Sequence, residues 1–520
     1  MLTKHAVNNP LSLHVPGHQY GNALERLSSS DSLQESIWRR FKPLMELDVT
    51  ELSATDDLHH PEASILQAQR LAAQCFGAEE TFFLVGGSTS GNLSLVLTVC
   101  KPGDLIIVQR NVHKSILNGL KLAGAMAVFL TPEIEPASGI ATVPSVLQLE
   151  RALNKYPEAK AVFLTNPNYY GMGVKLARYA EAIHRHGIPL LIDEAHGAHY
   201  GLHIGLPDSA LSSGADAVVQ STHKTLPALT MGAMLHIQGN RLDKDQLKQN
   251  LSMIQSSSPS FPIMASLDIS RAMIQSAGSE LFEPSLEAAN SFKRWIKEQC
   301  SFIGAMEWKE VEESTEIGKD KGTSLPTGSL RDNDLIIDPL RVLLFDKSGK
   351  LSGFDILKQL ESYGCWAEMA DTRYAVLLIG IGTDSAKLSR LREAISCMDI
   401  NCKLLNEGLV VDPHSREKTA RKDVVDQACY EEDEGIGEPV AFGRTPNSGA
   451  TQMVPLQKAE GFRAAEMIVP YPPGIPVVYA GERLTGAVIE LLKRLAEAGA
   501  KFQGAKSERL SEIEVFKSRD

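Results

Sequence analysis

The chain has 520 residues, enough for two large domains or roughly three or four domains of average size. Hydrophobic residues make up 43% of it and charged residues 22%, which excludes a fibrous, coiled-coil or wholly disordered protein. Acidic side chains outnumber basic ones and give a net charge of −12. Because such a surface does not attract a polyanion, we expect no nucleic-acid partner.

Cysteine usage and the lack of long apolar runs indicate the compartment. The N-terminus has no signal-peptide pattern, and no stretch of about 18 apolar residues occurs. We therefore expect a soluble cytoplasmic protein with no membrane partner. The cysteines form no CxxC pair or zinc-like cluster, which predicts reduced thiols and no metal site; they are Cys75, Cys100, Cys300, Cys365, Cys397, Cys402 and Cys429.

Short apolar runs of β-forming residues alternate with helix-length segments in the first half of the chain. Strands that are apolar on both faces and spaced by helices form a mostly parallel sheet covered on both sides. The pattern therefore predicts an α/β fold built on a mostly parallel seven-stranded sheet. The predicted strands are residues 81–85, 104–109, 126–130, 161–165, 188–193, 217–221 and 232–237.

The sequence around this sheet predicts three parts. Residues 1–60 form an N-terminal arm, and residues 61–300 form the large α/β domain. Residues 301–520 contain two further apolar runs and two amphipathic segments, which predict a smaller α+β C-terminal domain. Within that domain, residues 412–450 are polar with blocks of charge, a composition typical of a loop or disordered insertion.

Glycine and hydroxyl residues follow the first predicted strand. Gly87, Ser88 and Thr89 stand between this strand and a predicted helix. Glycines let the backbone approach a ligand closely, and the N–H groups of a helix start donate to anions together with the hydroxyls. The pattern therefore favours a phosphate site. An ordinary Gly/Ser turn that caps the helix is the alternative.

An acid and a lysine follow two later strands. Asp193 ends an apolar run, at the edge where doubly wound sheets bind ligands. Lys224 ends the run Ser221-Thr222-His223-Lys224 after the next strand. Burial lowers the pKa of a lysine and permits Schiff-base chemistry. A helix-capping Asp193 and a solvated Lys224 are the alternatives, but the coincidence of three strand ends favours a site for pyridoxal 5'-phosphate (PLP).

The same motifs, in consistent order, resemble those of the Orn/Lys/Arg decarboxylases. The resemblance implies a PLP-dependent enzyme with the aspartate aminotransferase fold, fold type I. It extends over about residues 10–490 and rests on the segments 14–18 (HVPGH), 56–61 (DDLHHP), 87–90 (GSTS), 110–115 (RNVHKS), 193–199 (DEAHGAH), 221–224 (STHK), 257–260 (SSPS) and 470–476 (PYPPGIP).

The resemblance implies a role for individual residues. Lys224 would hold the cofactor covalently, Asp193 would bond its pyridine nitrogen, and His113 and Ala195 would lie on the two faces of its ring. A simple helix-start role is the alternative for His113. The remaining residues implied to contact the cofactor, most of them at its phosphate, are Gly87, Ser88, Thr89, His196, Ser221, His223, Ser257 and Ser258.

The loop with Ser257 and Ser258 resembles the segment that reaches the cofactor of a neighbouring subunit, which implies a homodimer or a small multiple of it. Larger bacterial members of the family carry an N-terminal receiver-like domain that builds decamers. Because the motifs here start at residue 14, we expect the short form without that domain. One departure is Gln19, which follows Gly17-His18 where the family usually has lysine and puts the contacts of that loop in doubt.

The resemblance implies decarboxylation of a basic L-amino acid to its amine and CO₂ for polyamine synthesis, with arginine favoured, lysine next and ornithine third. His223 or Lys224 would supply the proton to Cα. The distal cation of the substrate requires an acidic or hydrogen-bonding partner. The candidates are Glu51, Asp56, Asp57, Glu368, Asp371 and Glu466.

Two other functions fit part of the pattern. The same phosphate cup, Asp193 and Lys224 serve an aminotransferase or a carbon–carbon lyase of fold type I. A non-catalytic regulatory relative is the third hypothesis. The presence of both Asp193 and Lys224 argues against it.

Overall fold

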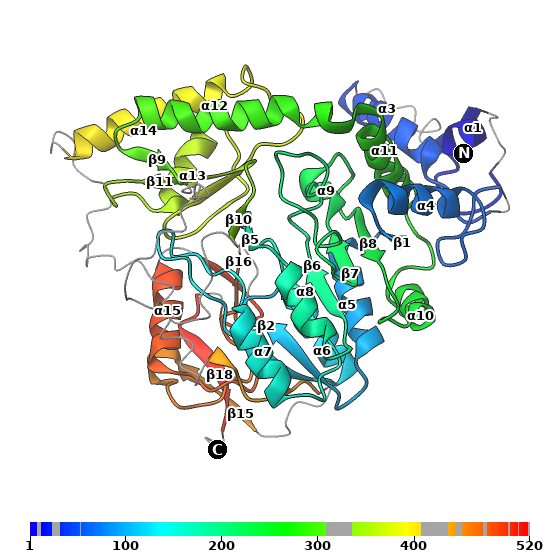
Figure 1. Cartoon of the computed structure of the whole chain (residues 1–520). Coiled ribbons are helices and arrows are strands. Elements are labelled where there is room, and N and C mark those ends of the chain that lie inside the picture. Colours follow the sequence, from blue (N-terminus) through cyan, green and yellow to red (C-terminus); the bar gives the residue numbers. More distant parts are fainter. Residues whose placement is uncertain are drawn as a thin grey trace, which may run out of the picture.

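The fold is organised around one large β-sheet. Figure 1 shows the computed structural model, which describes residues 1–7, 12–22, 32–52, 54–307, 335–406, 435–443, 450–471, 476–497, 500–507 and 509–517. The strands of the large sheet are β1 (Glu80–Leu84), β2 (Leu105–Gln109), β3 (Met126–Leu130), β4 (Val162–Thr165), β6 (Leu190–Asp193), β7 (Ala217–Gln220), β8 (Ala233–Ile237) and β14 (Val440–Ala441). Their order across the sheet is β1-β8-β7-β6-β4-β2-β3-β14.

The strands in the middle of this sheet run parallel. β3, β2, β4, β6 and β7 pair in parallel, whereas β8 pairs antiparallel with β7 and β1. The predicted α/β fold with a mostly parallel sheet is confirmed, and each of the seven predicted strands belongs to the sheet. The eighth strand, β14, was not predicted.

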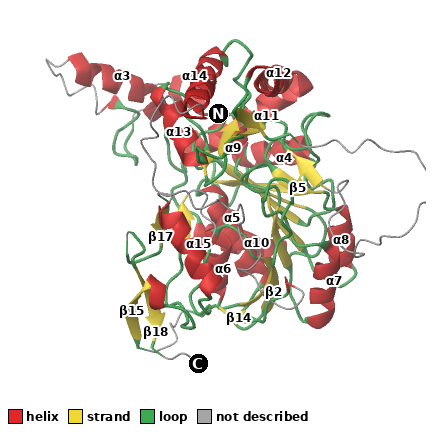
Figure 2. Cartoon of the chain, turned by 90° about the vertical axis from the view of Figure 1, so that its left-hand side faces the viewer, coloured by secondary structure: helices red, strands yellow, loops and turns green. Residues whose placement is uncertain are grey.

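The parallel strands of the sheet send alternate side chains into two separate cores. In β2, Ile106 and Val108 join one core, while Leu105 and Ile107 join the other. Figure 2 shows the helix layers that cover the two faces of the sheet. Because both faces are buried, the strands are apolar throughout. The covering helices are α5 (Gly87–Val99), α6 (Lys114–Ala123) and α10 (Lys244–Ile254) on one face, and α7 (Val146–Lys155) and α8 (Ala177–His184) on the other.

Part of the predicted polar insertion belongs to the large sheet. Val440 and Ala441 form β14, which pairs antiparallel with β3. Ile436 is buried in the core beneath it, and the N–H of Thr131 donates to the carbonyl of Gly435. The expected loop or disordered insertion was therefore wrong for residues 435–443, because a few apolar positions suffice to cover an open sheet edge. Residues 412–434 and 444–449 of that prediction lie outside the described residues.

A second, four-stranded sheet has the order β12-β13-β11-β9. Its strands are β9 (Ile303–Ala305), β11 (Arg341–Asp346), β12 (Met369–Ala370) and β13 (Ala375–Leu378), and its helices are α12 (Glu283–Gln299), α13 (Gly353–Ser362) and α14 (Ser389–Asn406). A short antiparallel pair, β5 (Met172–Val174) and β10 (Leu335–Ile337), ties this sheet to the large domain. The pair brings the start of β11 to the carboxyl edge of the large sheet.

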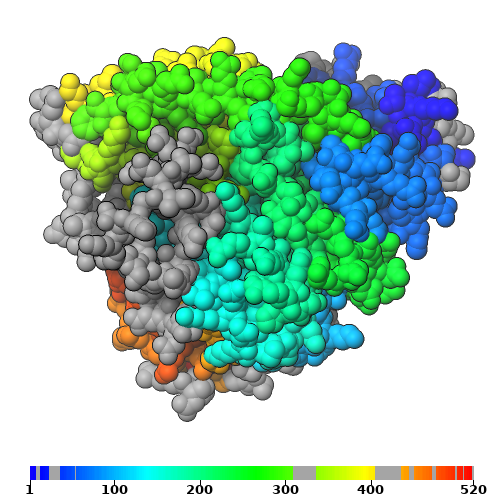
Figure 3. Space-filling model, in the orientation of Figure 1, coloured from blue at the N-terminus to red at the C-terminus, as the bar shows by residue number. Residues whose placement is uncertain are grey.

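One core joins all three predicted parts of the chain. It contains Tyr20 from the N-terminal arm, Phe261 from the large domain and Leu344 from the second sheet. The N-terminal elements and the helices beside them are α1 (Leu2–Val7), α3 (Ser32–Leu47), α4 (Ser64–Phe76), α11 (Phe261–Ala277) and the 3₁₀ helix η1 (Gly278–Leu281). They lie on the side of the molecule opposite the C-terminal residues (Figure 3).

The described residues from 450 to 517 form a third packing unit with its own core, which includes Ile468, Leu492 and Val515. The expected single domain over residues 301–520 thus contains two packing units. Of the motif at 470–476, residues 472–475 lie outside the described part. The elements of this unit are β15 (Thr451–Pro455), η5 (Leu456–Lys458), β16 (Val469–Tyr471), α15 (Gly486–Glu497), β17 (Lys501–Gln503) and β18 (Glu512–Phe516).

The third unit is attached to the large sheet by aromatic stacking. The ring of Tyr479 stacks on Phe129 of β3 with centroids 4.9 Å apart, and the guanidinium of Arg110 lies 4.2 Å from the centroid of Tyr479. Arg110 also pairs with Glu482. Stacked and charge-paired groups of this kind restrict the loop after β2 to one conformation.

None of the described helices is both long and apolar enough to cross a bilayer. Among the described residues, six cysteines are free thiols, as predicted, and Cys429 lies outside them.

The edge strand β14 provides a stability test. Replacing Ile436 with Ala should lower the free energy of unfolding by about 2 kcal/mol or more, because the change leaves a cavity in a packed core. The matched control is Glu438→Ala, which removes an exposed ion pair with Lys155 and should change stability by about 1 kcal/mol or less. Chemical denaturation measures both variants. Equal effects would show that Ile436 contributes nothing to the core.

Candidate functional site

The candidate site lies where parallel strands of the large sheet end. Asp193 is the last residue of β6 and stands in register with Val219 of the neighbouring β7. The chain leaves β7 directly into the short helix α9 (Thr222–Thr225), which carries Lys224. Because adjacent parallel strands end at the same edge, the predicted acid and lysine come to one place.

Lys224 is the buried amine of this site. Its Nζ lies 2.9 Å from Nε2 of His196 and 5.8 Å from the centroid of the Tyr169 ring. Burial lowers the pKa of Lys224, and the Arg341 cation acts in the same direction, while the carboxylates of Asp193 and Glu368 oppose it. A lowered pKa makes the uncharged, nucleophilic form of the amine easier to reach.

Asp193 is oriented by two donors. The side-chain amide of Asn92 donates to its Oδ2 at 2.9 Å, and the N–H of Ala195 donates to its Oδ1 at 3.1 Å. Asn92 also donates to the hydroxyl of Ser115 at 2.9 Å. A buried carboxylate held in this way keeps one orientation toward a ligand.

His113 lies beside these groups as the N-cap of α6. The N–H of Ser115 donates to its Nδ1 at 3.2 Å. Burial lowers the pKa of His113, the Asp193 carboxylate opposes this, and the Lys224 cation adds to it. The helix-start role considered for His113 is therefore present. The N-cap position holds the imidazole of His113 near Asp193 and Lys224.

Small hydroxyl residues lie at the start of α5. The hydroxyl of Ser88 is 2.6 Å from that of Ser221, although the two residues follow different strands. Gly87 has φ +72°, a conformation that favours glycine. No side chain caps α5, and Thr89 is exposed in its first turn. A helix start flanked by hydroxyls suits an anion such as a phosphate.

His223 and the Ser257–Ser258 loop differ in their positions. The Nδ1 of His223 donates to the carbonyl of Gly232 at 3.0 Å, next to Lys224. Ser257 and Ser258 are exposed, and their loop is held by His59, whose Nε2 lies 3.0 Å from the carbonyl of Ser256. The structure therefore brings His223 to the site but holds the two serines through contacts outside it.

Glu194 shows that adjacent acids have different surroundings. Its carboxylate accepts from the N–H of Ala210 at 2.8 Å and from the side chains of Ser209 and Gln220 at 3.2 and 2.7 Å. Burial raises the pKa of Glu194 to about 8. Glu194 therefore faces the protein interior, because successive side chains of a strand point to opposite sides.

The six acids considered for the distal cation of a substrate are not equivalent. Glu368 is exposed, and its charge acts on Lys224. Glu51 is partly buried beside Asp57, and burial together with Asp57 raises its pKa. The other four accept local hydrogen bonds: Asp56 from Ala63 and Ile65, Asp57 from His59, Asp371 from Tyr170, and Glu466 from Lys506 and Glu514.

Sequence reasoning gave no role to Asn92, Tyr169 and Arg341. Asn92 follows Ser88 by four residues, which places both on the same side of α5, so helical spacing contained a signal for it. Arg341 approaches from the start of β11 and donates to Nδ1 of His196 at 3.0 Å. The sequence around Arg341 contains no comparable signal.

The residues fit PLP. The buried amine of Lys224 can bond an aldehyde, the oriented carboxylate of Asp193 can pair with a pyridinium, and the start of α5 with Ser88 and Ser221 can accept a phosphate. The side-chain oxygen of Asn92, whose amide nitrogen bonds Asp193, is buried and has no hydrogen-bond partner among the described residues. The individual role of each residue stays a prediction.

Comparison with known proteins identifies the relatives of the chain. Residues 1–387 match the major domain of the Orn/Lys/Arg decarboxylases, and residues 427–509 match the C-terminal domain of the same family. An arginine decarboxylase of Bacillus subtilis is 31% identical over 524 aligned residues, which cover 100% of this chain and 97% of that protein.

Two further relatives are similar over most of the chain. The uncharacterized protein YaaO of Bacillus subtilis is 38% identical, covering 97% of this chain and 95% of its own length. Lysine decarboxylase LdcA of Pseudomonas aeruginosa is 26% identical, with coverage of 95% and 74%. The structure of Francisella novicida lysine decarboxylase LdcF has a TM-score of 0.76 at 20% identity, covering 99% of this chain and 80% of that one. The predicted fold type I is thus confirmed.

The role of Asp193 is tested by cofactor binding. Replacing Asp193 with Asn should preserve the fold and weaken PLP binding roughly tenfold to a hundredfold, because a charge-assisted hydrogen bond contributes about 1.5–3 kcal/mol. Asp216→Asn is the matched control. It changes a buried carboxylate that bonds His184 and the N–H of Leu190 at the other end of the strands. Cofactor titration followed by absorbance measures both. Equal affinities in both variants would remove Asp193 from the site.

Proposed function

Because the chain belongs to the Orn/Lys/Arg decarboxylase family and is a PLP-dependent amino-acid decarboxylase, we propose that it decarboxylates arginine, with lysine as the next candidate and ornithine as the third. The amine product would feed polyamine synthesis in the cytoplasm. The similarity to arginine decarboxylases that extends over nearly their whole length carries the preference for arginine. Lysine decarboxylase LdcA is matched over 74% of its length.

Lys224 and Asp193 would perform the central tasks. The bound cofactor supplies an electron sink for the pair of electrons that CO₂ leaves behind. Lys224 would bond the cofactor and yield its place to the amino group of the substrate. Asp193 would hold the proton on the pyridine nitrogen, as its fixed orientation by Asn92 and Ala195 allows. Ala195 and His113 would pack against the two faces of the cofactor ring.

Proton return to Cα requires an acid near Lys224. His223 is one candidate, because its Nδ1 is occupied with the carbonyl of Gly232 and its Nε2 is left for a ligand. Lys224 is the other candidate. Both stand on the same short helix, α9.

We assign the distal cation of the substrate to Glu368. This carboxylate precedes β12, is exposed, and its charge acts on Lys224. A guanidinium or ammonium that enters beside Lys224 would meet it before any acid engaged in local hydrogen bonds. Such a contact gives a basic substrate an opposite charge and an acceptor for its N–H groups.

The exposed Ser257–Ser258 loop supports a homodimer with shared sites. Its hydroxyls and the rigid Pro259 suit a loop directed at an anion, and its own subunit holds it through His59. In the dimer, the loop would complete the phosphate site of the partner.

The product screen tests reaction and substrate together. Purified protein with PLP should release CO₂ and the corresponding amine in equal amounts, fastest from arginine, while Lys224→Ala should release neither. The variant should also lack the visible absorption band of the lysine-bound cofactor. Transfer of the amino group to a keto acid without release of CO₂ would favour an aminotransferase. Lysine as the better substrate would overturn the arginine preference.

Changing Glu368 to Gln should raise the KM for arginine by roughly tenfold to a hundredfold with a smaller effect on kcat, because it removes one charge-assisted contact of about 1.5–3 kcal/mol. The control is Glu361→Gln, an exposed carboxylate on α13 of the same packing unit. Steady-state kinetics compares the two. Unchanged KM values in both variants would assign the distal cation to another residue.

Mixing two inactive variants tests the shared site. One carries Lys224→Ala, and the other carries bulky acids at Ser257 and Ser258. In a shared-site dimer the mixed dimer has one site with both defects and one with neither, so partial activity should return. Failure of activity to return despite demonstrated subunit exchange would place the loop away from the partner's cofactor.

A further inference from the structure

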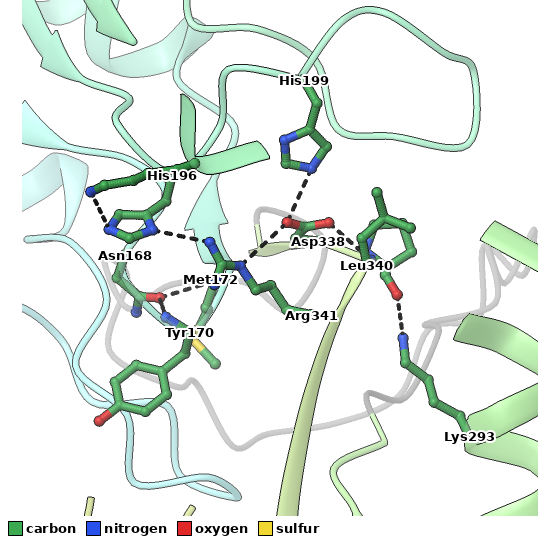
Figure 4. A network of polar contacts seen from close by, with 11 residues as sticks. Asn168, Tyr170, Met172, His196, His199, Lys293, Asp338, Leu340 and Arg341 are labelled. Atoms are coloured by element: carbon green, nitrogen blue, oxygen red, sulfur yellow. Dashed lines mark hydrogen bonds and ion pairs between the residues drawn. The ribbon is translucent and has the colours of Figure 1, made fainter. Parts of the chain in front are cut away.

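A buried chain of polar contacts connects Lys224 to the second sheet. His196 lies between two basic groups: its Nε2 is 2.9 Å from Nζ of Lys224, and its Nδ1 is 3.0 Å from Nη2 of Arg341. Figure 4 shows Arg341 approaching the imidazole from the β11 side. Both nitrogens of this buried imidazole are therefore engaged.

The hydrogen-bond donors and acceptors of Arg341, His196 and Lys224 fit together in one arrangement. A guanidinium only donates hydrogen bonds, so Nδ1 of His196 must accept. A neutral imidazole has one N–H and one lone pair, so its hydrogen is on Nε2. This hydrogen points at Nζ of Lys224, which must then accept it. An ammonium group has no lone pair with which to accept, so Lys224 is the neutral amine.

The position of Arg341 is determined by its surroundings. Its Nε lies 3.8 Å from Oδ2 of Asp338, and Nε2 of His199 lies 3.1 Å from the same oxygen. A β-carbon added to Gly171 would lie 2.5 Å from Cγ of Arg341, so the arginine stem packs against glycine backbone. These contacts hold the stem of Arg341, and its Nη2 lies on His196.

We propose that Arg341 is a positioning residue: it keeps the hydrogen of His196 on Nε2 and thereby holds Lys224 as a neutral amine whenever Lys224 is not bonded to the cofactor. The inference rests on the proposed role of Lys224 as the lysine that bonds the cofactor. It is independent of which basic amino acid is the substrate, but a neutral Lys224 has no acidic proton to return to Cα, so of the two candidates it leaves that step to His223.

The charges around the network agree with this arrangement. Burial lowers the pKa of His196 well below its usual value, and the Arg341 cation lowers it further, so the imidazole is neutral. Burial alone would raise the pKa of Asp338, but His199 and Arg341 outweigh it and keep Asp338 ionised. The titratable and charged groups that face Lys224 and His196 from the surrounding elements are Asp193, Glu368, Arg341, His113 and His223.

A neutral Lys224 has a direct chemical use. When a substrate amine has replaced Lys224 on the cofactor, the lysine must later attack the same carbon to release the product. Only the uncharged amine has the lone pair for that attack. Arg341 would thus speed the return of Lys224 without touching substrate or cofactor.

The first test measures the ionisation of Lys224 itself. The cofactor is removed from the holoenzyme, amines are labelled with limiting acetic anhydride over a range of pH, and the Lys224 peptide is quantified by mass spectrometry. Rebinding of PLP confirms that the protein stays native. Lys224 should titrate well below exposed Lys121. Titration of Lys224 in the range of an ordinary lysine would overturn the proposal, whatever the variants do.

The second test uses variants. Arg341→Met should raise the apparent pKa of Lys224 by about one unit or more, so that its labelling at neutral pH slows about tenfold. Arg341→Lys keeps a cationic donor and should stay close to the parent. Lys293→Met is the matched control, because it removes a buried cation of the same region that bonds the carbonyl of Pro339 at 2.7 Å and does not contact His196.

A double-mutant cycle tests whether Arg341 acts on Lys224 through His196 or through its positive charge alone. If Arg341 acts through His196, Arg341→Met should have little further effect on Lys224 in a His196→Phe protein. If the two substitutions shift Lys224 additively, Arg341 acts by its charge alone and the proposal fails. The readout is the titration of one lysine in the absence of substrate, so the result does not depend on the proposed reaction.

Discussion

A buried amine opposite a buried carboxylate is the constraint on which the site depends. Removing Lys224 and Asp193 from water is unfavourable unless each has fixed polar partners. The chain supplies these partners from separate elements: Asn92 from α5 and Ala195 from the loop after β6 hold the acid, and His196 holds the amine. The desolvation that destabilises the pair also lowers the pKa of Lys224, which favours the proposed role of this amine as a nucleophile.

Such a pair needs a rigid support, and the large sheet provides it. Alternate side chains of every central strand enter two packed cores, so the strand ends cannot shift independently. The loop after β2, which leads to His113, is held from the other side by Arg110, Tyr479 and Phe129. The third packing unit thus stabilises a loop of the site although its own core lies elsewhere.

The sequence predicted the positions that local patterns determine and missed those that depend on contacts between distant segments. Lys224 and Asp193 were predictable because strand ends of a parallel sheet converge whatever the side chains do. Arg341 was not, because it meets His196 across 145 residues through the β5–β10 pair, which no local pattern encodes. β14 was missed because two apolar residues in a polar segment resemble a loop until an open sheet edge is known to lie beside them.

The side chains of residues 193–199 leave the end of β6 in different directions. This short segment therefore contacts several separate parts of the molecule. Asp193 faces the site, while Glu194 turns into the interior and bonds Gln220. His196 bridges Lys224 and Arg341, and His199 reaches Asp338. The segment therefore carries contacts from the large sheet to the second sheet, and Lys224 is one end of them.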